Sequence, residues 1–191
     1  RRYTCGAAAW RRALRRALRL AAGAQEQVDA HTVDGQAVDL GALDAHAREV
    51  DVVEAAARQQ RIRIECDIPP LPAIPGDRLM LEQVLLNLIR NGMEAMTSTS
   101  EADRLLRIEV TQEGYSLRVS VNDQGCGIAP EFRDKLFTAF FTTKPEGMGV
   151  GLSICRSIVE FHRGQIWVED NSSSSTGTGS RFIFTLSLDA T

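Results

Sequence analysis

The stretch NLIRNGMEAM, residues 87–96, lies in the second half of a segment whose apolar residues recur at helical spacing. This periodicity predicts a long helix over about 77–97. Asn87 and Asn91 are four residues apart, so both amides project from one face of that helix, and Glu94 follows one turn further along the same side. The sequence therefore predicts a polar site on an otherwise apolar helix.

The two asparagines allow a functional and a structural interpretation. Amide oxygens are hard neutral ligands that suit Mg²⁺, which keeps most of its waters and takes one or two protein ligands besides phosphate. Alternatively, both side chains lie on a solvated helix face. Asparagine is a poor helix former, and Gly92 directly after Asn91 weakens the helix further. Such residues inside a strongly periodic helix hint at function, because sequence rules fail chiefly at functional sites.

The sequence on both sides of this helix alternates between helical and strand patterns from Val38 onward. A proline-rich loop over 68–76 precedes Asp77, which is placed to cap the long helix. Two strands form a predicted hairpin around a Gln-Glu-Gly turn, with apolar residues alternating inward. The predicted elements beside the long helix are helices over 41–59 and 151–162 and strands over 61–66, 106–111, 116–123, 165–169 and 181–188. This order indicates a mixed α/β domain.

A carboxylate and two glycines follow the second hairpin strand, in the motif Asp123-Gln-Gly125-Cys-Gly127. A carboxylate at a strand end can accept hydrogen bonds from a ligand's amino group, and glycines allow close approach. Taken alone, the motif more often marks an ordinary Asp-x-Gly turn.

A second glycine motif, Gly147-Met-Gly149-Val-Gly151-Leu152, opens the last predicted helix. Glycines let backbone N–H groups converge, and a helix N-terminus adds partial positive charge, so the motif suits phosphate. The alternative is flexible chain without a ligand. The motif is neither a dinucleotide-binding fingerprint nor a P-loop, because it lacks their spacing and the Gly-Lys-Ser/Thr sequence.

Three phenylalanines stand just before this motif. At their spacing, Phe137, Phe140 and Phe141 are expected in the core. Directly after them, Thr142, Thr143 and Lys144 are candidates to reach a phosphate, although Lys144 can equally be solvated.

Composition limits the class of partner. The net charge is −3, but seven arginines lie in the first 19 residues, and the remaining chain holds 15 basic and 25 acidic residues, a net charge of −10. Such an acidic body argues against nucleic-acid binding, which needs a basic surface. The four cysteines show no Cys-x-x-Cys pair, which argues against zinc and a disulfide framework and indicates a reducing, cytoplasmic compartment.

The N-terminal residues differ from the rest. Residues 1–22 are patterned as a basic amphipathic helix, which allows a membrane-surface helix, one strand of a helical dimerisation hairpin, or a helix with a solvated polar face. Residues 23–37 are expected to be a linker. The start, Arg1-Arg2 without Met, suggests an internal fragment.

The order of the motifs resembles one family: the ATP-binding catalytic domain of bacterial two-component sensor histidine kinases, in the gyrase–chaperone–kinase–mismatch-repair superfamily. NLIRNGMEAM resembles its asparagine box, VNDQGCGI its first glycine box, LFTAFFTTK its phenylalanine box, and GMGVGLSICRSIVEFHRG its second glycine box. GTGSRFIFTL is similar to its last strand. The resemblance implies a two-layer α/β sandwich of the Bergerat type, a mixed sheet with helices on one face, over a domain at 38–191 after a lead-in at 1–37.

The resemblance also implies roles for single residues. Asn91 would ligate Mg²⁺, and Asn87 would stand near the phosphates of ATP. Asp123 would bind the adenine amino group, in a pocket shaped by Gly125 and Gly127. Residues from about Thr138 to Gly149 would form a mobile lid. The remaining implied ATP-binding residues are Thr142, Thr143, Lys144, Gly147, Gly149, Gly151 and Leu152.

Two departures from the family pattern shape the expected reaction. Position 94 holds Glu where many members have a basic residue, which puts a phosphate contact there in doubt. No histidine fits the family's phosphoacceptor box, since His31, His46 and His162 lack its acidic neighbour. The chain is therefore expected to phosphorylate a histidine on a dimerisation domain elsewhere in the full-length protein.

The resemblance further implies a response regulator downstream, a homodimeric full-length protein and a monomeric isolated domain. It also implies a cytoplasmic location, either as a cytoplasmic protein or as the cytoplasmic part of a membrane-bound sensor. Two other functions stay open. One is ATP hydrolysis, which superfamily members carry out with a Glu where this chain has Asn87. The other is a non-catalytic module that senses ATP.

Overall fold

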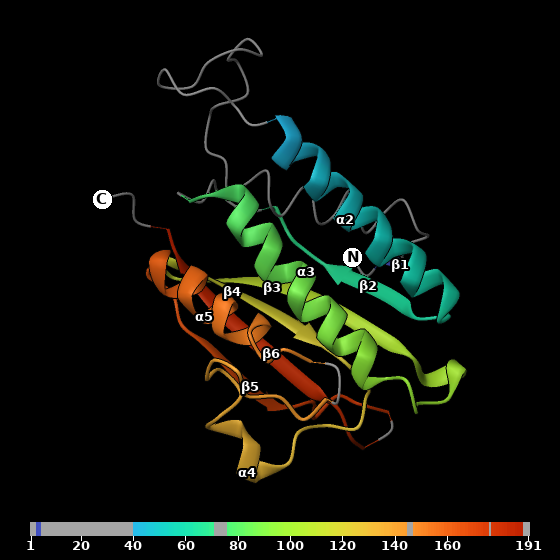
Figure 1. The fold of residues 1–191 in the computed structure, drawn as a ribbon. Coiled ribbons are helices and arrows are strands. Elements are labelled where there is room, and N and C mark those ends of the chain that lie inside the picture. Colours follow the sequence, from blue (N-terminus) through green and yellow to red (C-terminus); the bar gives the residue numbers. More distant parts are fainter. Residues whose placement is uncertain (1–2, 5–39, 71–75, 145–146, 176, 189–191) are drawn as a thin grey trace, which may run out of the picture.

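The computed structural model describes residues 3–4, 40–70, 76–144, 147–175 and 177–188, and for residues 3–4 and 40–48 the backbone only. A six-stranded sheet forms one layer, in the order β1-β2-β3-β4-β6-β5. The helices α2, α3 and α5 lie over one face of it (Figure 1). The strands are β1 Tyr3–Thr4, β2 Arg63–Asp67, β3 Leu105–Glu113, β4 Ser116–Asn122, β5 Ile166–Asp170 and β6 Ser180–Ser187. The helices are α2 Leu40–Gln59, α3 Arg78–Ala95, η1 Glu101–Asp103, α4 Pro130–Arg133 and α5 Gly151–Phe161.

The sheet is mixed because its connections differ. Strands β2 and β3 pair in parallel, since helix α3 crosses over between them, whereas β3–β4, β4–β6 and β5–β6 pair antiparallel. Inward residues of β3 and β4 pack under α3, and α5 packs over β5 and β6; the side chains of Leu106, Ile108 and Leu117 are almost completely buried. The predicted two-layer α/β sandwich, with helices on one face, is confirmed.

Helix α3 begins as its sequence predicts. Asp77 accepts a hydrogen bond from Met80 N at 3.1 Å and so caps the first turn. Its own N–H donates to Nε2 of His162, at 2.9 Å, and Nδ1 of that imidazole lies 2.7 Å from the carbonyl oxygen of Ile158. The end of α5 is thereby joined to the start of α3, and this contact helps to set how the two helices that bear the candidate motifs lie relative to each other.

Several sequence predictions need correction. The hairpin turn is Gly114-Tyr115 and not Gln-Glu-Gly, because Gln112 and Glu113 continue β3 and Gly114 supplies the positive φ of 62°. Tyr3–Thr4 pair with β2 as a short strand, so a helix over 1–22 is wrong at these two positions. The remainder of that basic segment and the linker at 23–37 lie outside the described residues.

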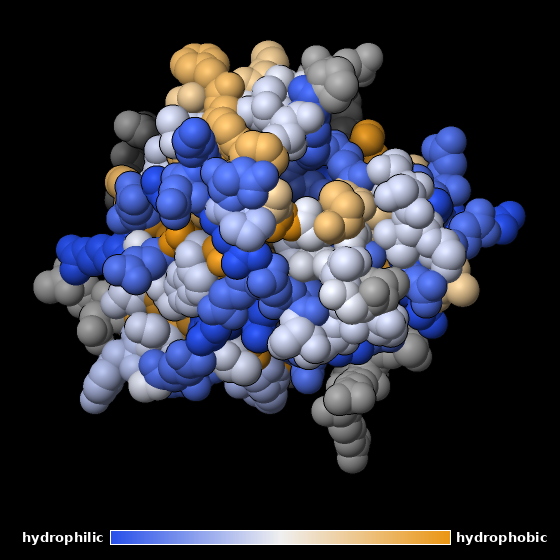
Figure 2. Space-filling view, turned by 90° about the horizontal axis from the view of Figure 1, so that it is seen from below, coloured by the Kyte–Doolittle hydropathy of each residue, from blue (hydrophilic) through white to orange (hydrophobic). Residues whose placement is uncertain are grey.

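The outer face of the sheet is charged. Arg107 pairs with Glu65 at 3.0 Å, and Arg181 lies 3.8 Å from Glu109. Seen from below, the molecule is mostly hydrophilic, with hydrophobic residues gathered at the upper edge of the view (Figure 2). Within the described residues, no helix combines the length and the apolar character needed to cross a membrane.

Candidate functional site

A cavity of about 540 Å³ lies between α3, the ends of β4 and β6, the start of α5 and the segment before α5. We call the described residues 138–144 and 147–149 the lid segment. All but one of the site residues predicted from sequence line this cavity: Asn87, Asn91, Asp123, Gly127, Thr142, Thr143, Lys144, Gly147, Gly149, Gly151 and Leu152. Motifs that are far apart in the sequence therefore meet in one place.

Asp123 is the most deeply buried charged group of the cavity, with 2% of its surface exposed. Its Oδ1 accepts hydrogen bonds from Gly125 N at 2.9 Å and Ser180 N at 3.2 Å. Burial nevertheless raises the pKa of this carboxyl to about 6, because the cost of desolvating the charge exceeds the gain from the two hydrogen bonds. Among the described residues none donates to Oδ2, which leaves this oxygen for a ligand's donor.

Gly125 is the predicted site residue that does not line the cavity. A Cβ at this position would lie 2.5 Å from the carbonyl oxygen of Ala95, and Cys126 N donates to that same oxygen at 3.2 Å. Gly125 thus acts by packing the loop after β4 against the end of α3. It positions Asp123 and contributes no surface to a ligand.

Asn87 links α3 to the start of α5. Its Nδ2 lies 3.4 Å from Sγ of Cys155, and a Cβ added to Gly151 would lie 2.8 Å from both its Oδ1 and its Nδ2. Burial raises the pKa of the Cys155 thiol to about 12, so this thiol stays protonated at neutral pH. Gly151 is needed because the helix start approaches the amide so closely.

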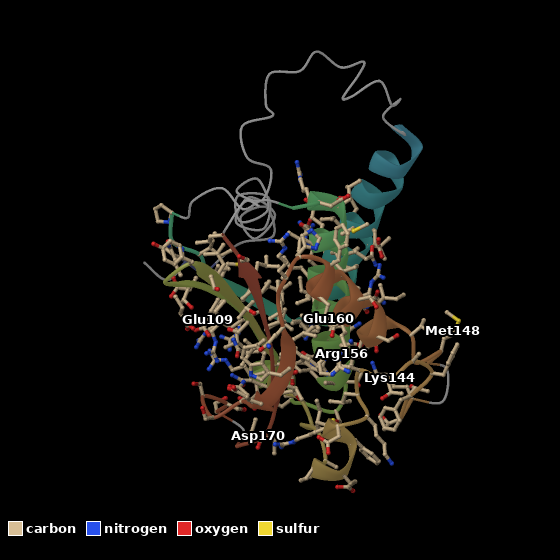
Figure 3. The ribbon with its side chains drawn as sticks, turned by 90° about the vertical axis from the view of Figure 1, so that its left-hand side faces the viewer. Glu109, Lys144, Met148, Arg156, Glu160 and Asp170 are labelled. Atoms are coloured by element: carbon tan, nitrogen blue, oxygen red, sulfur yellow. The ribbon has the colours of Figure 1, made fainter. Side chains whose placement is uncertain are left out.

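Asn91 and Glu94 contact the lid segment. Lys144 Nζ donates to Oδ1 of Asn91 at 3.2 Å and pairs with the Glu94 carboxylate. Figure 3 shows Lys144 and Met148 on the side of the molecule away from Glu109, with Met148 projecting outward. The contact of Glu94 with the lysine was not predicted from sequence.

The lid segment folds against itself. Thr142 Oγ1 accepts a hydrogen bond from Lys144 N at 3.0 Å, and a Cβ on Gly147 would lie 2.6 Å from this hydroxyl. A Cβ on Gly149, which has a φ of 66°, would lie 2.5 Å from the carbonyl carbon of Phe140. These two glycines therefore shape the lid segment as well as the cavity wall.

The expectation that three phenylalanines lie in the core is right for Phe137 and wrong for Phe140 and Phe141. Phe137 is buried and stacks edge-on against Phe182, with ring centroids 6.4 Å apart. Phe140 is 80% exposed and has a positive φ of 66°, so its side chain points away from the core. Phe141 is partly buried and lines the cavity.

The two helix starts differ in their capping. Helix α3 has the side chain of Asp77 as its cap, whereas α5 begins after Val150 without a side-chain cap. The first N–H groups of α5, from Gly151 and Leu152, thus face the cavity with the partial positive charge of the helix end. An anion such as phosphate is the natural partner for this helix end.

Sequence reasoning missed part of the site. Ser180 supplies a backbone N–H to Asp123, and its signal was its place directly before the predicted last strand; in the structure it is the first residue of β6. The apolar wall had no motif of its own, because its members come from separate elements: Ile128, Leu136, Val150 and Phe182. These side chains can pack against a flat apolar ligand, and the Asp123 carboxylate can accept one hydrogen bond from it.

Known proteins share this arrangement. Residues 76–190 match the family described as "Histidine kinase-, DNA gyrase B-, and HSP90-like ATPase". The C4-dicarboxylate transport sensor protein DctS of Rhodobacter capsulatus is 36% identical over 165 residues, which are 86% of this chain and 24% of DctS. The first curated relatives are much longer, since the chain spans between 22% and 25% of their length.

Solved structures agree. The catalytic domain of histidine kinase ThkA, in a nucleotide-free form, aligns with a TM-score of 0.61 and 33% identity over 79% of this chain and 93% of that domain. Full-length ShkA, solved in complex with AMPPNP, aligns with a TM-score of 0.61 and 28% identity over 86% of this chain and 34% of its own. The chain therefore belongs to the family of histidine kinase-, DNA gyrase B- and HSP90-like ATPases, and it is similar to the ATP-binding catalytic domain of sensor histidine kinases.

Proposed function

We propose that the cavity binds ATP with Mg²⁺, and that the domain transfers the γ-phosphoryl group to a histidine of a dimerisation domain outside this chain. One observation carries the proposal: a single cavity contains a buried carboxylate, an apolar wall, and an uncapped helix N-terminus beside two amides. These features match an amino-bearing base and a polyphosphate. The nucleotide complex of ShkA supports the same assignment.

The adenine end is assigned to Asp123. Its Oδ2 would accept a hydrogen bond from the base amino group, while Gly125 N and Ser180 N keep the carboxylate in place through Oδ1. Gly127, with a φ of 74°, lets the loop turn tightly at the cavity edge. The apolar wall then excludes water from the base.

The phosphate end is assigned to the start of α5 and to the lid segment. The N–H groups of Gly151 and Leu152 would face the phosphates, with Gly147 and Gly149 shaping the approach. Thr142, Thr143 and Lys144 line the same part of the cavity and can donate to phosphate oxygens.

The residues present fit a magnesium ion. Asn91 Oδ1 already accepts a hydrogen bond from a cationic group, and the Glu94 carboxylate contacts that same cation, so the site attracts positive charge through oxygen atoms. Such oxygens are the ligands that Mg²⁺ prefers. Asn91 would hold the ion, and its chemistry there is neutralisation of charge on the phosphates.

The chain's own contribution to the reaction is positioning. Phosphoryl transfer needs little covalent chemistry from the protein, which orients the donor and neutralises its charge. Asn87 cannot take a proton from water at neutral pH, which argues against ATP hydrolysis as the main activity. The intact set of cavity residues argues against a module that only senses ATP.

The domain and its partners follow from this function. We propose a catalytic domain at 38–191 behind a lead-in at 1–37, which is a neighbour of the dimerisation segment and of which Tyr3–Thr4 add a short strand to the sheet. The partners would be the histidine-bearing domain of the same full-length homodimer and a response regulator, in the cytoplasm where ATP is available.

We expect Asn91→Ala to reduce phosphotransfer at least about 100-fold, because the loss of a charge-stabilising group in the transition state costs roughly 3 kcal/mol. The assay combines γ-labelled ATP, the 191-residue chain and a separately supplied dimerisation domain of the full-length protein, and it measures labelled histidine.

The control is Glu160→Ala, on the exposed side of α5 and outside the cavity, which should transfer phosphate like the unmodified chain. Binding of ATP without any transfer would contradict the kinase proposal and favour a sensor. Steady release of phosphate that is lost in Asn87→Ala would favour hydrolysis.

A further inference from the structure

The lid segment carries a charge that is already paired inside the cavity. Lys144 Nζ contacts both Oδ1 of Asn91, at 3.2 Å, and the carboxylate of Glu94. Asn91 and Glu94 are three residues apart on α3, so their oxygens lie on one face, one turn apart. This pair of oxygens holds the lysine ammonium between them.

The hydrogen bond joins the candidate phosphate ligand, Lys144, to the candidate magnesium ligand, Asn91, and neither residue can bind its own ligand while the two are in contact. Lys144 is a candidate to bind phosphate, but it cannot serve that role while its ammonium stays on Glu94. Asn91 is the candidate magnesium ligand, and the ammonium lies on the same oxygen that the metal would use. Lys144 and a metal ion would therefore compete for this oxygen.

The backbone transmits this contact to the lid segment. Lys144 N donates to Thr142 Oγ1 at 3.0 Å, and Lys144 O accepts from Gly147 N at 3.2 Å, so the lysine is part of a tight turn. The side chain of Lys144 therefore fastens this turn to α3. Both partners are about half exposed, with 46% and 54% of their side chains accessible, so the pair is weak enough to be exchanged.

We propose that Glu94 is a positioning residue that makes nucleotide binding depend on Mg²⁺. Without the metal, Glu94 and Asn91 hold Lys144 and close the lid segment against α3, and the Glu94 carboxylate repels phosphate. With the nucleotide bound, the oxygens of Asn91 and Glu94 would hold Mg²⁺, which would neutralise charge on the phosphates, and Lys144 would be free to donate to phosphate oxygens. The proposal rests on ATP binding in this cavity.

The first test measures nucleotide affinity with a fluorescent ATP analogue, in excess EDTA and in Mg²⁺. In EDTA, Glu94→Gln should bind about three- to tenfold more tightly than the unmodified chain, because it removes the acidic charge and frees the lysine. The increase in nucleotide affinity on adding Mg²⁺ should be smaller for Glu94→Gln than for the unmodified chain, by a similar factor. Glu160→Gln changes the same charge outside the cavity and should leave both affinities unchanged.

The second test needs no nucleotide. Lys135 and Lys144 are the only lysines of the chain, so limited acetylation followed by mass spectrometry reports on each ammonium separately. Glu94→Gln should raise the acetylation rate of Lys144 about three- to fivefold and leave that of exposed Lys135 unchanged. High salt should reduce the difference, because it screens exposed ion pairs.

The outcomes separate this proposal from the function on which it rests. If the unmodified chain binds no nucleotide even with Mg²⁺, the proposed function fails, whatever the acetylation shows. If that chain binds nucleotide but Glu94→Gln has the same affinity in EDTA, or the same acetylation rate at Lys144, then Glu94 does not hold the lysine and the inference is overturned.

Discussion

Asp123→Asn should weaken ATP binding roughly 10- to 100-fold and at the same time stabilise the nucleotide-free protein at pH 7. Both effects have one cause. Gly125 N and Ser180 N donate to a single oxygen, so the amide oxygen of the introduced asparagine would stay on them. Its amide nitrogen would then replace Oδ2, and a donor would face the amino group of the base.

The gain in stability follows from the pKa. Burial raises the pKa of the Asp123 carboxyl from 3.8 to about 6, so the folded protein binds the proton more tightly than the unfolded chain does. The free energy of unfolding therefore falls as the pH rises from about 4 to about 6. At pH 7 the buried ionised carboxylate still destabilises the fold. The amide of the Asp123→Asn variant carries no charge, and we expect it to stabilise the fold by roughly 1–3 kcal/mol at that pH.

Two measurements check this prediction. Thermal unfolding without nucleotide should show a higher Tm for Asp123→Asn at pH 7, and the difference should disappear near pH 4. Titration with ATP from pH 7 to pH 5 should weaken binding about tenfold for the unmodified chain, which loses its carboxylate over that range, and much less for the variant. A variant that binds ATP normally at pH 7 would refute the adenine assignment.

The features that could be predicted from the sequence are those that depend on the local residue pattern. Periodicity placed α3 and α5 within a few residues, and the cap at Asp77 was predicted from its position alone. Asn87 and Asn91 were predicted on one helix face, and both line the cavity. These predictions succeed because helix geometry fixes which residues share a face.

The sequence-based predictions failed where the role of a residue depends on its contact with a residue far away in the sequence. From sequence, Gly92 is only a poor helix former, yet a Cβ there would lie 2.5 Å from Leu106 Cδ1 and 3.3 Å from Asp123 Cβ. The glycine lets α3 approach β3 and the buried carboxylate. The contact of Glu94 with Lys144 joins residues 50 positions apart, and no spacing rule predicts it. Phe140 was misplaced because the spacing of the phenylalanines does not reveal the local backbone, which has a positive φ at this residue and leaves its side chain exposed.

Gly179→Ala should cost the fold roughly 3 kcal/mol or more, and it should weaken ATP binding as well. A Cβ at this position would lie 2.3 Å from the backbone oxygen of Asp123, and the φ of 129° is strained for any L side chain. Backbone must then shift, and the next residue, Ser180, donates its N–H to the Asp123 carboxylate. The substitution thus acts on the fold and on the adenine anchor together.

Gly177→Ala is the matched control, two residues earlier in the same loop. Gly177 also has a positive φ, of 72°, but a Cβ there would meet no atom within 4 Å. Its substitution costs only the strain of the backbone, about 1 kcal/mol. In a protein of this size we expect Tm to fall by about 2–4 °C for Gly177→Ala and by roughly 6–12 °C for Gly179→Ala. Equal losses in the two variants would mean that backbone strain alone, and not the close approach to Asp123, explains the glycine at 179.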